Sequence, residues 1–270
     1  MPNDNAAGST SKPDRSPEHT ARRYVERLQS HRSPADAAKR QRYLKSRAGD
    51  GDVVIGVRMK HVFELSKEFK EMPLGEIEKL LESRIHEVRA GGVKIMAYQA
   101  ASKTTPEGRR REVFELYLRR HDRINDWDLV DLGAWDVVGR YLVDKPREVL
   151  YQLAPSTNVW ERRTAILATL YFVRQGDLDD TFRIAEELVN DDHDLVQKAV
   201  GGSLREAGKH DRGRLLGFLD NHAATMPRTV LRYAIEHLDK DQRSDYMTKR
   251  SRLDPRVGGL ATPQSSGVGQ

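Results

Sequence analysis

Apolar residues recur at intervals of three and four positions along most of the chain, which is the spacing of one buried helix face. The segment KHVFELSKEFKEM, for example, places Val62, Leu65 and Phe69 on one side. The same rhythm continues in RREVFELYLRRH, VWERRTAILATLYFVRQG, DLVQKAVGGSLREAGKH and PRTVLRYAIEHL. The one β-like run, GDVVIGV at 51–57, is too short to predict a sheet. The pattern therefore predicts an all-α protein.

Gly, Pro, Asn and Asp separate the periodic segments, as helix ends require. Gly91 and Gly92 predict a break inside residues 73–102, and Asn158 with Glu161 three positions later resembles a capping box. About a dozen helices in hairpins of roughly 35–40 residues predict an α-solenoid of HEAT-like repeats, because no such hairpin buries its apolar face alone. A right-handed stack of this kind has a long concave groove that suits a long ligand such as a DNA duplex.

The two ends of the chain differ in composition from its middle. Residues 1–18 and 251–270 are rich in small and polar residues and contain Pro, so we expect disordered tails there. Residues 19–250 are expected to form one α-solenoid domain.

Composition excludes several classes of protein. No apolar run approaches the length of a membrane span, and no apolar leader begins the chain, so we expect a cytoplasmic, nucleoid-associated protein without membrane contact. Zero Cys excludes disulfides and thiolate chemistry. A net charge of +5 favours polyanionic partners, although such an excess is also compatible with an ordinary solvated surface. We expect a monomer that needs no cofactor and no metal.

The segment NDWDLVDLGAWDVVG concentrates two Trp residues and several acids. A helix from about Asp126 to Leu142, capped by Asn125, would align Trp127, Asp131 and Trp135 on one stripe. The plainer interpretation is an amphipathic helix in which Trp127 packs against a neighbour and Asp131 is solvated or paired to an Arg. One hairpin later come the two arginines of VWERRTAIL, and equivalent faces of neighbouring repeats can converge.

Several stretches resemble, in order and spacing, the DNA alkylation repair family of HEAT-like-repeat DNA glycosylases, the AlkD type. They are QRYLKS with IGVRM, NDWDLVD, VWERRTAIL, HDLVQKAVGGSLREAGK and HAATMPRTVLRYAIE. The resemblance spans roughly residues 23–245. It implies an α-solenoid that cradles duplex DNA and hydrolyses the N-glycosidic bond of N3- or N7-alkylated purines.

The resemblance assigns roles to individual residues. Trp127 matches the groove Trp, Asp131 the catalytic carboxylate, Arg163 the arginine that contacts the DNA backbone, and Tyr43 an aromatic of the first repeat. The family usually has a Trp after KAVG, where this chain has Gly202. The resemblance therefore implies a cleft that lacks one wall, unless Trp135 or Trp160 replaces it.

Further cations are candidates for DNA contacts. Lys198 and Arg205 are seven positions apart and can share a helix face, and Arg228 lies near a helix N-terminus. These positions favour contacts with backbone phosphates, which are salt-sensitive and independent of base sequence, although solvent is an equally good partner.

The chemistry of a cationic lesion fits the absence of a sequence-adjacent general acid. An N3- or N7-alkylated purine leaves as a neutral base, and an ionised Asp131 would stabilise the oxocarbenium ion that forms on the sugar. Two alternatives stay open at this point. One is a noncatalytic HEAT-like module that binds DNA structure or damage, and the other is a protein-binding scaffold.

Overall fold

The computed structural model describes residues 19–44 and 52–249, with side chains omitted at 41–44. Every regular element in these residues is helical, and the β-like run forms only an isolated bridge between Val53 and Ile85. The all-α prediction is therefore confirmed. The two expected tails and the side chain of Tyr43 lie outside the described part of the chain. Among the described helices, none combines the length and hydropathy that crossing a bilayer requires.

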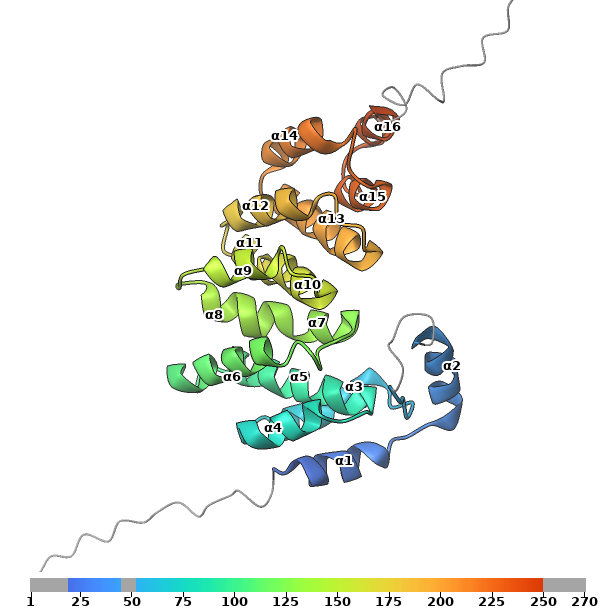
Figure 1. Ribbon diagram of the computed structural model, residues 1–270, viewed down its shortest axis with the longest axis vertical. Coiled ribbons are helices and arrows are strands. Elements are labelled where there is room, and N and C mark those ends of the chain that lie inside the picture. Colours follow the sequence, from blue (N-terminus) through green and yellow to red (C-terminus); the bar gives the residue numbers. More distant parts are fainter. Residues whose placement is uncertain (1–18, 45–51, 250–270) are drawn as a thin grey trace, which may run out of the picture. The chain divides into compact units, whose positions relative to one another are not determined.

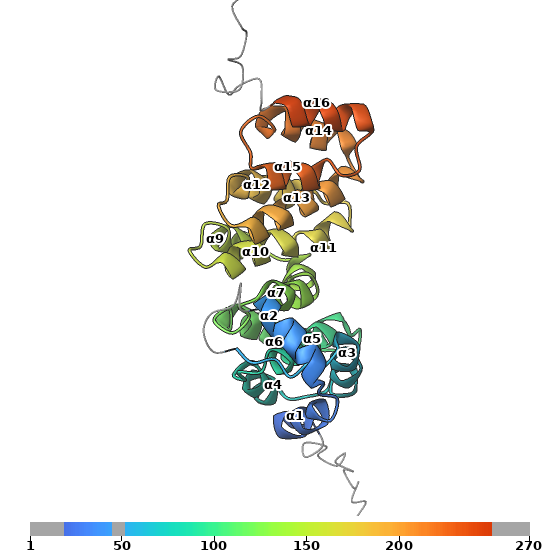
Figure 2. The same ribbon diagram turned by 90° about the vertical axis from the view of Figure 1, so that its right-hand side faces the viewer.

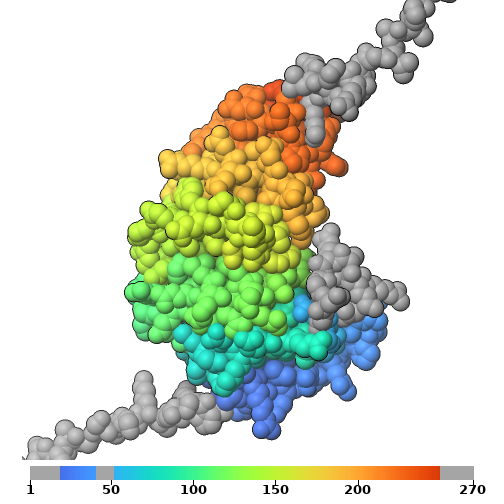
Figure 3. All heavy atoms as spheres, viewed as in Figure 1, coloured from blue at the N-terminus to red at the C-terminus, as the bar shows by residue number. Residues whose placement is uncertain are grey.

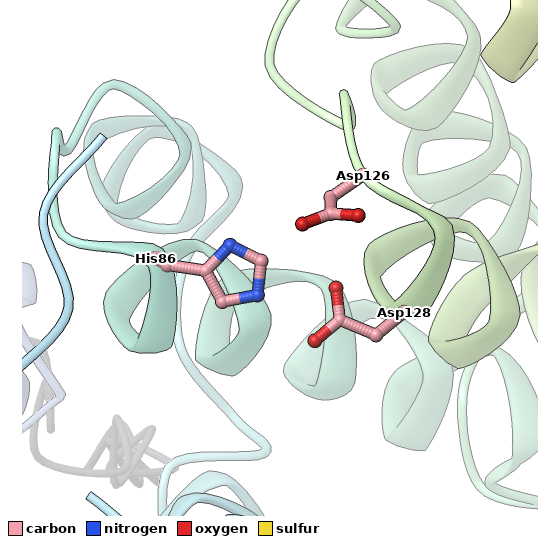
Figure 4. A group of neighbouring side chains, drawn as sticks. All are labelled: His86, Asp126 and Asp128. Carbon is pink, nitrogen blue, oxygen red and sulfur yellow. The ribbon is translucent and has the colours of Figure 1, made fainter. Parts of the chain in front are cut away.

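The chain divides into two compact units at Gln99 and Ala100. The first unit contains α1 (Ala21–Gln29), α2 (Pro34–Leu44), α3 (Met59–Glu68), α4 (Leu74–Leu81) and most of α5 (His86–Ala101), and His86 opens α5 (Figure 4). Its core gathers apolar residues from α1, α3, α4 and α5 around Tyr24, whose hydroxyl lies 3.0 Å from that of Ser66.

The predicted break at Gly91 and Gly92 is wrong, because α5 runs through both glycines without interruption. A Cβ atom at Gly91 would lie 2.1 Å from the Tyr24 hydroxyl oxygen, and one at Gly92 would lie 3.1 Å from the Leu81 side chain. The glycines therefore allow α1 and α4 to approach α5 closely, and this packing outweighs the helix-breaking tendency of about 1 kcal/mol per glycine.

The second unit contains the remaining helices in chain order. They are α6 (Glu107–Arg119), α7 (Trp127–Gly133), the π-helical turn η1 (Ala134–Gly139), α8 (Arg140–Leu142), α9 (Glu148–Leu153), α10 (Val159–Ala168), α11 (Leu170–Val173), α12 (Asp179–Leu188), α13 (Asp194–Gly208), α14 (Arg212–His222), α15 (Arg228–Ala234) and α16 (Lys240–Lys249).

Two rows of helices build this unit. Helices α7, α10, α13 and α15 pack side by side and form what we call the α7–α15 row, while α9, α12 and α14 lie behind it (Figures 1 and 2). Successive hairpins cover one another as contiguous bands (Figure 3). The second unit is thus a solenoid of helical hairpins, in which each hairpin buries its apolar face against the next.

Glycines set the closest approaches along the row. A Cβ atom at Gly139 would lie 2.2 Å from the backbone oxygen of Ala168, and one at Gly201 would lie 2.5 Å from that of Val230. Only a residue without a Cβ fits such contacts, so these two positions hold η1 close to the α10–α11 helices and α13 close to α15.

Candidate functional site

The candidate residues of the second unit share the α7–α15 row. Helix α7 bears Trp127 and Asp131, α10 bears Arg163, α13 bears Lys198 and Arg205, and α15 begins with Arg228. Positions that are far apart in the sequence are therefore brought onto consecutive helices of one row, as the stacking of repeats predicts.

An ion pair joins the two residues that the sequence analysis singled out most strongly. Arg163 donates from Nε to Oδ1 of Asp131 at 3.0 Å, and from Nη2 to Oδ1 and Oδ2 at 2.8 and 3.0 Å. The partners are 32 positions apart, on neighbouring helices of the row. Arg163 is only 7% exposed, whereas the Asp131 side chain is 38% exposed. The arginine thus lies behind the carboxylate, which faces outward.

Arg163 also connects the pair to the next hairpin. Its Nη1 donates to the backbone oxygen of Leu195, at the start of α13. Every nitrogen of the guanidinium therefore has a protein acceptor. Arg163 is therefore held by α7 on one side and α13 on the other, and it supports Asp131. A contact of Arg163 with a DNA phosphate stays a prediction.

The environment of Asp131 disfavours its charge. Burial raises the pKa of this carboxyl above its usual range, and the nearby Asp128 adds to the rise, while the charge and hydrogen bonds of Arg163 oppose it. The Asp131 side chain is nevertheless 38% exposed, so solvent reaches the carboxyl group. A carboxylate that is partly desolvated and open on one side interacts strongly with any cation that arrives there.

A buried polar network supports the same turn of α10. Thr164 lies 3.3 Å from the Tyr117 hydroxyl and 3.1 Å from Nε2 of His121, whose Nδ1 lies 3.1 Å from the Leu118 oxygen. Burial lowers the pKa of His121, so the ring is neutral, and its one proton is assigned to Nδ1 because the Leu118 oxygen can only accept. Thr164 then donates to Nε2 and accepts from Tyr117. The network fixes the helix turn that also bears Arg163.

Comparison with known proteins identifies the family of this chain. The family model described as DNA alkylation repair enzyme matches residues 24–238. This chain belongs to that family. The fold of a predicted DNA alkylation repair enzyme from Enterococcus faecalis matches with a TM-score of 0.63 and 18% identity, over 78% of this chain and 98% of that chain.

A second solved structure, AlkD2 from Streptococcus mutans, matches with a TM-score of 0.50 and 17% identity, over 82% of this chain and 100% of that chain. No curated protein matches the sequence. At these identities the two structures support the shared fold alone, so the roles of individual residues in this DNA alkylation repair family protein rest on its own geometry.

The start of α7 differs in detail from the prediction. The cap is Asp126 and not Asn125: its Oδ1 accepts the Trp127 backbone N–H at 2.7 Å. Figure 4 shows Asp126 just ahead of the helix and Asp128 within its first turn. Asp126 takes the role because a carboxylate at the N-cap satisfies a free N–H group and also favours the positive end of the helix dipole. Trp127, half-buried, begins the helix one turn before Asp131.

The predicted straight helix to Leu142 is interrupted by the π turn η1. Trp135 lies in this turn, where its ring packs edge-on against Tyr171 at 6.2 Å and beneath the guanidinium of Arg174 at 4.9 Å. These contacts favour the interpretation of Trp135 as a packing residue of the α11 hairpin.

Trp160 is the better placed of the two aromatic substitutes. It precedes Arg163 by three positions on α10, so the two side chains share one face, and its ring lies edge-on to His193 at 6.3 Å. Asn158 caps this helix by accepting the Trp160 backbone N–H at 3.0 Å, as predicted. The other half of the predicted capping box is wrong, because the Glu161 carboxylate accepts a hydrogen bond from the Ser156 hydroxyl and not from the Asn158 backbone N–H.

Gly202 faces open space, since no atom lies within 4 Å of a Cβ built there. On the next helix Tyr233 is 37% exposed, and its Cβ lies close to the neighbouring Gly201. The helical pattern of the sequence does not mark this aromatic residue as a candidate. The one sequence feature that could have indicated its exposure is the pair Arg232-Tyr233, which interrupts the apolar run of α15.

The three other candidate cations have partners within the protein. Lys198 pairs with Asp194 at 2.8 Å, Arg205 pairs with Glu206 and Glu236, and Arg228 donates to the Met247 oxygen at 2.7 Å. The exposed ion pairs of Lys198 with Asp194 and of Arg205 with Glu236 stabilise a protein by only about 0–1 kcal/mol, so a DNA phosphate can replace the carboxylate in either. Contacts of these residues with DNA stay predictions.

Proposed function

We propose that this DNA alkylation repair family protein is a DNA glycosylase that hydrolyses the N-glycosidic bond of cationic N3- or N7-alkylated purines in duplex DNA. The observation that supports the proposal best is the Asp131 carboxylate, which is 38% exposed and is held by hydrogen bonds from the buried Arg163. A fixed negative charge in this setting is suited to a reaction in which positive charge develops on a sugar.

In the proposed reaction the alkylated base departs with the electrons of the glycosidic bond and becomes neutral, so no general acid is required. The deoxyribose becomes an oxocarbenium ion, which Asp131 stabilises by its charge. The same carboxylate accepts a hydrogen bond from the attacking water and orients it toward the anomeric carbon. Arg163 favours the ionised state of Asp131 and prevents the carboxylate from turning away.

Aromatic rings would complete the site. Trp127 lies one helix turn from Asp131, and a ring close to the cationic base or sugar contributes about 0.5–2 kcal/mol. Trp160 lies on the face of α10 that bears Arg163 and is the second candidate. Duplex DNA containing alkylated bases is the proposed partner, bound through cations of the α7–α15 row by a protein that acts as a monomer without cofactor or metal.

A noncatalytic role as a DNA-binding module is the second candidate function. Two observations favour it: Gly202 leaves open space beside the row, and the guanidinium of Arg163 is fully engaged by protein acceptors. Both functions predict DNA binding, so only base release separates them.

The test is base release from duplexes that contain a single modified purine. The proposal predicts release of N7-methylguanine well above the spontaneous rate, and no release of a neutral lesion such as hypoxanthine, which needs a general acid to depart. Asp131→Asn should bind the same duplex and lose the activity. Binding without release of N7-methylguanine by the wild-type protein would favour the noncatalytic module.

A further inference from the structure

A hollow of about 640 Å³ lies between α15 and α16, in the second unit. Arg232 from α15 and both Lys240 and Arg243 from α16 surround it. Its floor is apolar and includes Ile235 and Met247. We refer to it as the α15–α16 hollow.

The positive charge of this hollow is not neutralised by the protein. No carboxylate among the described residues forms an ion pair with Arg232, Lys240 or Arg243. The one acid in the lining, Glu236, accepts the guanidinium of Arg205 instead. Three cations therefore face the hollow without a protein anion, which leaves a local field that favours an anionic ligand.

Two other hollows of the same unit show the contrast. In the one of about 280 Å³ beside α14, Lys209 pairs with Glu206 and Arg212 with Asp239. In the one of about 230 Å³ beside α6, Lys145 pairs with two carboxylates at 2.8 Å. Apart from Lys103 beside α6, the lysines and arginines of those two hollows form ion pairs within the protein, so among the described residues three unpaired cations around one hollow distinguish the α15–α16 hollow from them.

Helix α16 itself contributes little to the core, since Tyr246 is its one buried residue. Polar contacts hold the helix in place: the Tyr246 hydroxyl donates to Oδ1 of Asp220 at 3.0 Å, and Arg228 donates to the Met247 oxygen. The family match ends at residue 238, before this helix begins. This polar helix therefore lies beyond the family match, and most of its side chains are directed to solvent.

We propose that the α15–α16 hollow binds the phosphodiester backbone of DNA, as a contact separate from the one at Asp131. Three cations around one rim suit successive phosphates of a strand, and the apolar floor suits the deoxyribose between them. The inference rests on DNA as the partner in the proposed function and not on base release.

The experiment measures how binding of an undamaged duplex depends on salt. Each phosphate contact contributes about −0.9 to the slope of log K against log salt, so the triple variant Arg232→Gln, Lys240→Gln, Arg243→Gln should flatten the slope by about 2–3. Arg243→Gln alone should flatten it by about 1. The rate of base release from saturated N7-methylguanine duplex should equal that of the wild type, because the hollow holds DNA and does not touch the reacting bond.

The matched control removes three exposed cations that lie in i,i+4 ion pairs elsewhere, by Arg22→Gln, Lys60→Gln and Arg111→Gln. This variant has the same net charge and should keep nearly the wild-type slope. Equal slopes in the two triple variants would overturn the inference. So would displacement of the duplex by millimolar inorganic phosphate, at constant ionic strength, from the wild type but not from the triple variant of the hollow.

The readout also separates this inference from the proposed function. If the wild type releases no base but the triple variant of the hollow has a flatter salt slope, the DNA contact is supported and the glycosylase is rejected. If the wild type releases the base and the triple variant keeps the wild-type slope, the glycosylase is supported and the DNA contact is rejected.

Discussion

Replacing Arg163 with Lys keeps a positive charge but removes the planar fork that holds Asp131. Arg163 makes three hydrogen bonds to this carboxylate and a further one to the Leu195 oxygen. A lysine ammonium is a single donor group on a flexible stem, so it can approach either the carboxylate or the carbonyl but cannot reproduce both contacts.

The expected cost follows from the hydrogen bonds that are lost. The charged hydrogen bond to the Leu195 oxygen contributes about 1.5–3 kcal/mol, and loss of a bidentate pair with a half-exposed carboxylate adds about 1 kcal/mol. Arg163→Lys should therefore destabilise the second unit by about 2–4 kcal/mol. In a domain of this size that corresponds to a fall in Tm of roughly 5–15 °C.

Urea unfolding followed by tryptophan fluorescence measures this cost, because Trp127, Trp135 and Trp160 are the three tryptophans of the chain and all belong to the second unit. The control is Arg214→Lys, the same substitution in the exposed pair with Asp179. That pair should lose less than about 1 kcal/mol. If Arg163→Lys costs no more than the control, Arg163 is not the structural support of Asp131, and the geometry assigned to the site is incorrect.

Three further predictions test other parts of the structure. Gly202→Ala should stabilise the protein by up to about 1 kcal/mol through helix propensity. Gly201→Ala should destabilise it, because the new Cβ atom meets the Val230 oxygen. Equal thermal stabilities of the two variants would contradict the close contact between α13 and α15. Thr164→Val leaves the buried Tyr117 hydroxyl without its acceptor and His121 without its donor, so chemical unfolding should show a loss of about 1–3 kcal/mol. Burial raises the pKa of Asp131, and only its ionised form is active in the proposed reaction. Single-turnover release of N7-methylguanine should therefore decline with falling pH, at pH values above the usual pKa range of aspartate. A rate that stays level through those pH values would contradict the role of this carboxylate.

Helical periodicity predicts the fold class because an amphipathic hairpin needs only the spacing of its apolar residues. Close packing of helices does not follow from spacing. Gly91 and Gly92 were expected to end a helix, yet they lie inside one, because their lack of side chains lets Tyr24 and Leu81 approach. The π turn η1 was likewise not predictable from the pattern of 126–142, since no residue type marks it.

The candidate site was predictable in part. Repeat stacking predicted that Asp131 and Arg163 would lie on neighbouring helices, and the structure joins them in one ion pair. The polar network below them was not predictable, because Tyr117, His121 and Thr164 resemble ordinary core positions in the sequence. Exposure of Tyr233 and the open charge of the α15–α16 hollow depend on which carboxylates lie nearby, and that is known only once the helices are placed.

The most direct test of the central claim is the single-turnover rate of N7-methylguanine release at saturating protein, compared between Asp131→Asn and Asp136→Asn. Asp136 is a half-buried carboxylate of the adjacent η1 turn, paired with Arg140 at 2.8 Å. The account predicts a fall of at least about 100-fold for Asp131→Asn, the usual cost of removing one electrostatic stabiliser, and a near wild-type rate for Asp136→Asn. Release by Asp131→Asn at the wild-type rate, from fully bound DNA, would contradict it.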